Sequence, residues 1–240
     1  MHGIRKYILL LIIGSAAFAA LFAYLGYRAF HEANEITAQS TFLVPSGQGL
    51  IRTARLLNEA ELISDPDIFK VGVMLKGAER SLKAGEFLIP PNSSMNDIMN
   101  VLVKGEVIQH KITIVEGWTS WQIADYLNGI ENLTDEILEL PIEGSILPES
   151  YLYTHGTSRF DLLMRMQEQQ LEVLDKLWDK RADNLPFDTV EEAIILASIV
   201  ERETGIPEER PHIAGAFVNR LRNSIRLQSD PTIIYGIDRK

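Results

Sequence analysis

The sequence contains no cysteine, few histidines and no excess of basic residues. Without cysteine, the chain can form neither a disulfide framework nor a thiolate metal site. Among its 5 histidines, none pairs with another His, Asp or Glu at the spacing of a metal-ligand set, and we interpret His212 as a surface residue. A net charge of −10 argues against a nucleic-acid-binding protein, which needs a basic face. We therefore expect no metal centre and no nucleic-acid partner.

Charge is also missing from a long apolar stretch near the N-terminus, residues 7–27. At about 1.5 Å per residue, a helix of this length spans about 31 Å, which matches a bilayer core. Arg5 and Lys6 precede it and predict a cytoplasmic N-terminus. The alternative is a cleaved signal peptide, but the apolar run continues past the small residues at 15–20. We favour an uncleaved single transmembrane helix within residues 1–30, with the bulk of the chain outside the cytoplasm.

The apolar spacing in residues 31–106 predicts a small module of strands and helices. A polar link precedes the first strand. The strand–helix–helix–strand order of residues 41–89 resembles a LysM-like module, a fold associated with binding N-acetylglucosamine glycans. The alternative is a packing unit without any glycan contact. The expected elements are strands over 41–44 and 82–89, and helices over 50–62, from 66 to 75 and from 95 to 102.

Residues 107–240 predict a second, mainly helical domain, so that the fold class of the whole chain is α+β. We expect a strand over 107–115, an amphipathic helix over 160–178, and a loop around Glu143-Gly-Ser-Ile-Leu-Pro-Glu-Ser-Tyr151 that either lines a cleft or forms a structural turn. Three aromatic residues follow the strand. They can stack on sugars, although the spacing of Trp121 with Ala124 and Leu127 favours core packing for that residue. These aromatic residues are Trp118, Trp121 and Tyr126.

A helix ending near Glu201 carries the strongest functional signal. Thr189 and Glu192 fit a capping box at its start, and residues 193–200 are apolar nearly all round, which predicts a buried helix. Burial and the negative end of a helix both favour the neutral form of a carboxyl group, and a protonated carboxyl can act as a general acid. The alternative is an ordinary solvated glutamate at the end of a helix.

Three separated motifs follow one another from residue 197 onward: Ala197-Ser-Ile-Val-Glu-Arg-Glu-Thr204, Asn219-Arg-Leu221, and Leu227-Gln-Ser-Asp-Pro-Thr-Ile-Ile-Tyr-Gly236. Together with residues 143–151, they resemble the endolytic murein transglycosylases, the MltG or YceG-like family. The resemblance implies that residues 107–240 form a catalytic domain. Family members continue well past the Tyr-Gly motif, so we expect this domain to be incomplete at Lys240.

The resemblance implies a lyase that cleaves the bond between N-acetylmuramic acid and N-acetylglucosamine in nascent peptidoglycan. Glu201 would be its single acid, the products would carry 1,6-anhydromuramoyl ends, and no cofactor would be needed. The implied location is the bacterial inner membrane, near the penicillin-binding synthases. The residues expected to hold the glycan are Asn219, Gln228, Asp230, Thr232 and Tyr235.

The competing hypothesis is a membrane-anchored, non-enzymatic scaffold that binds peptidoglycan, with Glu201 in a structural role. The environment of Glu201 separates the two hypotheses. An enzyme predicts a polar cleft that also exposes Gln228 and Asp230, whereas a scaffold predicts a glutamate held by an arginine such as Arg220.

Overall fold

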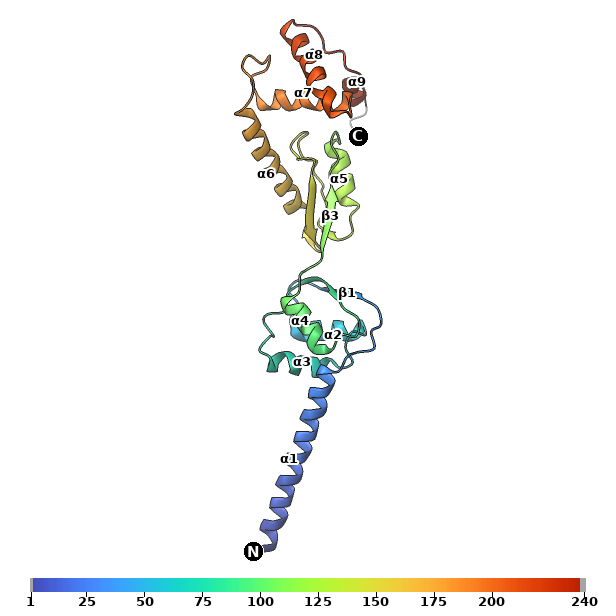
Figure 1. Ribbon diagram of the computed structural model, residues 1–240, viewed down its shortest axis with the longest axis vertical. Coiled ribbons are helices and arrows are strands. Elements are labelled where there is room, and N and C mark those ends of the chain that lie inside the picture. The colour runs from blue at the N-terminus through green and yellow to red at the C-terminus, as the bar shows by residue number, and fades with distance from the viewer. Residues whose placement is uncertain (1, 238–240) are drawn as a thin grey trace. The chain divides into compact units, whose positions relative to one another are not determined.

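The computed structural model describes residues 2–237, with side chains from residue 6 onward, and the chain divides into two compact units, Met1–Ile108 and Gln109–Lys240 (Figure 1). Helices combine with short strand pairs, which confirms the α+β class. In chain order the elements are α1 (His2–His31), β1 (Ser40–Val44), α2 (Leu50–Glu59), α3 (Pro66–Leu75), β2 (Gly85–Ile89), α4 (Met95–Lys104), β3 (Gln109–Thr113), α5 (Ser120–Asn128), β4 (Leu133–Thr134), β5 (Ser150–Thr154), β6 (Thr157–Ser158), α6 (Arg159–Trp178), α7 (Val190–Glu203), the 3-10 turn η1 (Pro207–Glu209), α8 (Arg210–Arg222) and α9 (Asp230–Ile237).

Helix α1 is long and apolar enough to cross a membrane, judged by length and composition. Side chains along its apolar stretch are exposed, as in Tyr7 and Tyr27 at the two ends. The helix does not stop at the end of this stretch. It continues into the core of unit 1, where Phe30 is 4% exposed and its ring lies 6.5 Å, centroid to centroid, from the ring of Phe69.

Unit 1 is built around an antiparallel pair, β1 and β2, in which Phe42 lies opposite Phe87. Helices α2, α3 and α4 complete the core. Asp65 caps α3 by accepting hydrogen bonds from two main-chain N–H groups, and Ser94 forms a capping box with Asp97 at the start of α4. The expected strand–helix–helix–strand order is therefore confirmed, with α2 and β2 shorter than predicted.

The contact between α1 and α3 is tight, because a β-carbon built on Gly72 would lie 2.2 Å from the ring of Phe30. We predict that Phe30→Ala destabilises unit 1 by about 3–5 kcal/mol, since it removes a fully packed ring and leaves a cavity. Hydrogen exchange of the α3 amides measures this loss. The exposed Phe22 on the same helix is the matched control, and equal protection in Phe30→Ala and Phe22→Ala would contradict the prediction.

Unit 2 has its own core between the β3–β5 pair and helices α5 and α6. Tyr151 in β5 is buried opposite Ile112, and its hydroxyl donates to the carbonyl of Leu147 at 2.7 Å. Burial raises the pKa of Tyr151 to about 12, with a smaller contribution from Glu149. The stretch expected as a loop over 143–151 therefore ends in a core strand.

The prediction that Trp121 packs in this core is wrong. Its helical partners Ala124 and Leu127 are 3% and 0% exposed, whereas Trp121 itself is 37% exposed. The reason is the angular position of Trp121 on α5, about 60° from Ala124, at the edge of the buried stripe. Trp118 lies partly buried against the same core, and its ring meets that of Tyr126 edge-on at 5.3 Å.

A buried arginine closes the core of unit 2 at the end of α5. Arg159, 7% exposed, is the first residue of α6 and donates to five main-chain carbonyls. Two of these carbonyls belong to the last turn of α5, where the helix carries partial negative charge. Arg159 thus supplies the hydrogen-bond donors that these loop carbonyls would otherwise find in water. Its acceptors are the carbonyls of Leu127 (2.7 Å), Asn128 (3.2 Å), Ile130, Leu133 (2.9 Å) and Asp135.

Helices α7, α8 and α9 form a second cluster in unit 2, with α8 and α9 lying against α7 (Figure 1). The capping box at the start of α7 is confirmed, because Thr189 Oγ1 accepts from the N–H of Glu192 at 3.2 Å. The prediction that α7 is buried all round is wrong. Leu196, Ile199 and Val200 are buried, but Ile195 is 61% exposed. Two neighbouring helices cover only one stripe of α7.

Candidate active site

Glu201 lies in the last turn of α7, where its side chain is 27% exposed. The guanidinium of Arg210, at the start of α8, donates to Glu201 Oε1 at 3.1 Å. Glu201 is therefore paired with an arginine, as the scaffold hypothesis predicts. The arginine is Arg210 and not Arg220, which donates to the carbonyl of Leu227.

The segment between α7 and α8 turns back so that Arg210 meets Glu201. Thr204 is buried, accepts from the N–H of Ile206 at 3.0 Å and donates to the carboxylate of Glu209 at 2.7 Å. The Nε atom of Arg210 is buried and has no hydrogen-bond partner within residues 2–237. Arg210 therefore has one buried donor without a partner, although the side chain as a whole is 40% exposed.

Two glycine turns from the first half of unit 2 lie along α7. A β-carbon on Gly117 would sit 3.8 Å from Glu201 Cγ and 3.1 Å from Arg202 Cδ, and its φ of +75° favours glycine. A β-carbon on Gly144 would sit 2.6 Å from Ile194 Cγ2. The turn that precedes α5 and the turn in the 143–151 stretch therefore both contact the helix that carries Glu201.

The 143–151 stretch also fixes the first of these turns. Glu143 accepts a hydrogen bond from the N–H of Ser120 at 3.0 Å, at the start of α5. Gln170 of α6 donates to the carbonyl of Gly144 at 2.9 Å. This stretch therefore acts as a structural brace between α5, α6 and α7, which is the role of a structural turn considered for it above.

The third motif is attached to the end of α7 through Ser229, which is 2% exposed and donates to the carboxylate of Glu203. Gln228 and Asp230, on either side of Ser229, are exposed. Gln228 has a φ of +52°, an uncommon conformation for a residue with a side chain, and such strain concentrates at functional sites. The hydrogen bond from Ser229 therefore holds the segment of Gln228 and Asp230 at the end of α7, two residues beyond Glu201.

Helix α9 begins at Asp230. Thr232 donates to the carbonyl of Ser229 at 2.6 Å, which gives its hydroxyl a structural partner. Tyr235 is 44% exposed on the same helix, which contacts α7. The roles of these residues in glycan binding stay predictions.

Asn219 is the predicted residue whose position is least suited to this site. It is exposed on α8 and lies nine residues after Arg210, which corresponds to about 13 Å along the helix and half a turn around it. Asn219 and Arg210 therefore occupy opposite faces of α8.

Sequence reasoning missed Arg210, Gly117 and the contact between Ser229 and Glu203. One signal for Arg210 was available, because a proline such as Pro211 marks the start of a helix. Arg210 precedes this proline and therefore begins the helix that follows the end of α7. The other two contacts join segments far apart in the chain and have no local signature. Among the described residues, no group of three His, Asp or Glu side chains could hold a metal ion.

These features define a class of protein: an α+β chain with a carboxyl–guanidinium pair at a helix end, beside a glycine turn. The sequence profile of the YceG-like family matches residues 42–240. The chain therefore belongs to the YceG-like family.

Two relatives carry the same name, endolytic murein transglycosylase. The protein of Bacillus subtilis is 24% identical over 80% of this chain, which covers 62% of that relative. The protein of Streptococcus pneumoniae is 28% identical over 80% of this chain, which covers 42% of that relative. The chain thus spans less than two thirds of the length of either. A crystal structure of a YceG-like protein from Listeria monocytogenes is 22% identical, with a TM-score of 0.42 over 83% of this chain and 75% of that one.

Proposed function

We propose that this chain is a membrane-anchored endolytic lytic transglycosylase. It would cleave the N-acetylmuramic acid–N-acetylglucosamine bond of nascent peptidoglycan strands and terminate their elongation. The observation that carries the proposal is Glu201, a half-buried carboxyl group in a stretch matched by the YceG-like profile. The names of the relatives supply the substrate class.

The reaction requires one carboxyl group with two successive roles. Glu201 first donates a proton to the glycosidic oxygen as the bond from that oxygen to C1 breaks. The 6-hydroxyl of the same muramic acid then forms a bond to C1 and gives its proton to the Glu201 carboxylate. The product is a 1,6-anhydro ring, and the acid is restored without water or a cofactor. Glu203, the nearest other carboxylate in the sequence, is engaged by Ser229, which agrees with a one-carboxylate mechanism.

Arg210 supports the second of these roles. Its guanidinium donates to Glu201 Oε1 at 3.1 Å and would offset the negative charge that Glu201 carries once its proton has been donated. The proton donor, in contrast, is the neutral acid, so the pair must loosen when the glycan enters the site. Arg210 is therefore a positioning residue that acts through Glu201.

We predict that Arg210→Ala lowers kcat by about tenfold to a hundredfold, with a smaller change in KM, because the proton shuttle is disturbed more than the glycan contacts. Arg210→Lys should recover part of the loss, since it keeps the charge. Arg222, an exposed cation on the same helix that donates to the carbonyl of Asn184, is the matched control. Steady-state digestion of purified glycan strands gives both constants. An unchanged kcat in Arg210→Ala would contradict the role.

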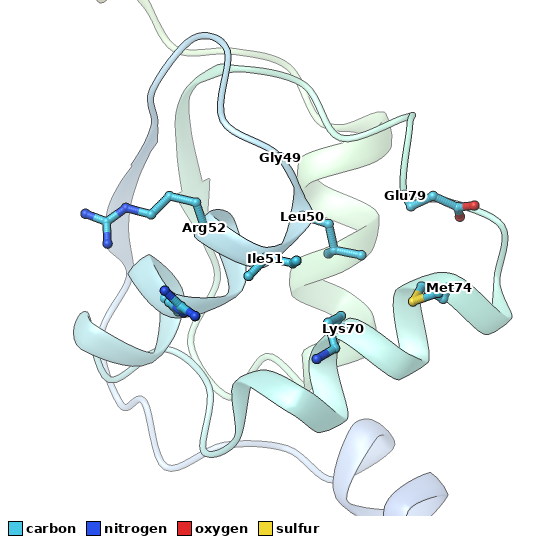
Figure 2. A pocket seen from close by; sticks show the side chains of 8 residues that line it. Gly49, Leu50, Ile51, Arg52, Lys70, Met74 and Glu79 are labelled. Atoms are coloured by element: carbon cyan, nitrogen blue, oxygen red, sulfur yellow. The ribbon is translucent and has the colours of Figure 1, made fainter.

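Unit 1 would hold the strand on which the site acts. A depression of about 510 Å³ lies between the first half of α2 and helix α3 (Figure 2). Apolar and charged side chains share its lining, which offers contacts both to the apolar face of a sugar and to its hydroxyl groups. With the strand–helix–helix–strand order, this depression supports a LysM-like role in glycan binding. Its lining includes Leu50, Ile51, Arg52, Lys70, Met74 and Glu79.

Helix α1 would anchor the protein in the inner membrane as a single span, with the N-terminus in the cytoplasm and both units outside. Nascent glycan strands are made at that surface, and the penicillin-binding synthases are the protein partners we propose there.

A non-enzymatic scaffold that binds peptidoglycan is the second candidate, and the ion pair of Glu201 with Arg210 is the observation that favours it. The test is digestion of intact peptidoglycan by the full chain in detergent, because truncation after residue 31 would remove Phe30 from the core. Release of soluble glycan fragments supports the enzyme. Binding of the protein to peptidoglycan without any release of fragments supports the scaffold.

A further inference from the structure

Helix α3 presents apolar side chains to the surface of unit 1. Val71 is 51% exposed and Leu75 is 84% exposed, whereas Phe69 and Val73, on the other side of the helix, are fully buried. Val71 and Leu75 are four residues apart and therefore neighbours on one face. Met74, 57% exposed, lies where this face meets the depression of Figure 2. Large side chains gathered in this way indicate a surface that contacts an apolar medium.

The position of α3 relative to α1 identifies that medium. The two helices touch where Phe30 packs on Phe69 and Gly72. Tyr27, the last residue of the uncharged stretch, precedes Phe30 by three residues, or about 4.5 Å along the helix. An interfacial aromatic belongs at the level of the lipid headgroups. Helix α3 therefore crosses α1 where the apolar stretch of α1 ends, and it lies at the α1 end of unit 1 (Figure 1).

We propose that α3 rests on the outer surface of the bilayer, with Val71 and Leu75 inserted among the lipid headgroups. The proposal relies on the proposed membrane anchor, which fixes the height of α3 above the hydrocarbon core. Because the headgroup layer is about 5–8 Å thick on each side, an element this close to Tyr27 cannot avoid it.

The charges around the patch fit a lipid surface. Asp67, on the same side of α3, is paired with Lys70 at 2.6 Å. Exposed Lys76 and Arg80 follow the patch in sequence, as expected for an interfacial helix flanked by cations. The membrane contact would hold unit 1 in one orientation, so that its depression meets strands close to the bilayer.

Depth-dependent fluorescence quenching tests this placement in the full chain. Since the chain has no cysteine, single-cysteine variants can be labelled cleanly with the fluorophore NBD. We would compare Leu75→Cys on α3, Leu11→Cys in the apolar stretch of α1, and Leu88→Cys on β2, which is 45% exposed. The proteins are reconstituted in vesicles of phosphatidylcholine and phosphatidylglycerol with spin labels placed either near the headgroup or near the end of the acyl chain.

The expected result is that position 75 is quenched mainly by the shallow spin label, position 11 mainly by the deep one, and position 88 by neither. If position 11 is deep but position 75 behaves like position 88, the anchor stands and the α3 contact is wrong. Equal shallow quenching at 75 and 88 would also overturn the α3 contact, because the bilayer would then not select one face. If position 11 is not quenched, both the anchor and the contact are wrong.

Discussion

Glu201→Gln should abolish cleavage of peptidoglycan, with a fall in kcat of about 10³–10⁴-fold. Glutamine keeps the size of the side chain and can still accept the hydrogen bond that Arg210 donates at 3.1 Å. It cannot donate a proton to the glycosidic oxygen, nor take one from the 6-hydroxyl. Because one carboxyl group would carry both proton transfers, its loss would remove both steps. The rate of fragment release from purified glycan strands measures the effect.

Glu203→Gln is the matched control for this experiment. Glu203 belongs to the same helix end, two residues away, but its carboxylate accepts the hydrogen bond of buried Ser229. We expect Glu203→Gln to change the rate by less than about tenfold, through the position of the 228–230 segment alone. Equal losses in the two variants would contradict a special role for Glu201 and would point to a general disturbance of the helix end.

Arg159→Met should destabilise unit 2 by about 3–5 kcal/mol. Methionine fills a similar volume but leaves the buried carbonyls around residues 127–135 without the donors that Arg159 provides. Each buried acceptor without a partner costs about 1–3 kcal/mol, and water entering the loop recovers part of the sum. Arg159→Lys should give an intermediate loss, since an ammonium group supplies three donors where the guanidinium supplies five.

Urea unfolding followed by tryptophan fluorescence measures this change. All 3 tryptophans of the chain, Trp118, Trp121 and Trp178, lie in unit 2 and report on it selectively. Arg165→Met is the control, because Arg165 is an exposed residue of the same helix with a single hydrogen bond, to the carbonyl of Leu152. A midpoint for Arg159→Met as high as that for Arg165→Met would show that the buried guanidinium contributes no stability.

Elements with strong local signals could be predicted from the sequence. The start of α7 follows from Thr189 and Glu192, and the start of α3 follows from Asp65 and Pro66. In each case the residues that satisfy the free N–H groups of the helix lie within four positions of one another, so the signal is contained in a short stretch.

The environment of Glu201 could not be predicted in the same way. An apolar run such as residues 193–200 indicates that a helix can be buried, but it does not indicate which face of the helix packs against a neighbouring helix. Ile195 is exposed because α8 packs on the side of Leu196 and Val200. The contact of Gly117 with Glu201 joins positions more than 80 residues apart, and only the tertiary fold brings them together.

The most direct test of the account is the mass of the new glycan ends formed when the full chain digests peptidoglycan in ¹⁸O-labelled water. Attack by the 6-hydroxyl predicts anhydromuramoyl ends that are one water lighter than hydrolysed ends and carry no label, and no new ends from Glu201→Gln. Labelled reducing ends from the wild-type chain would contradict the account, because water would then be the nucleophile and a second carboxylate would be required.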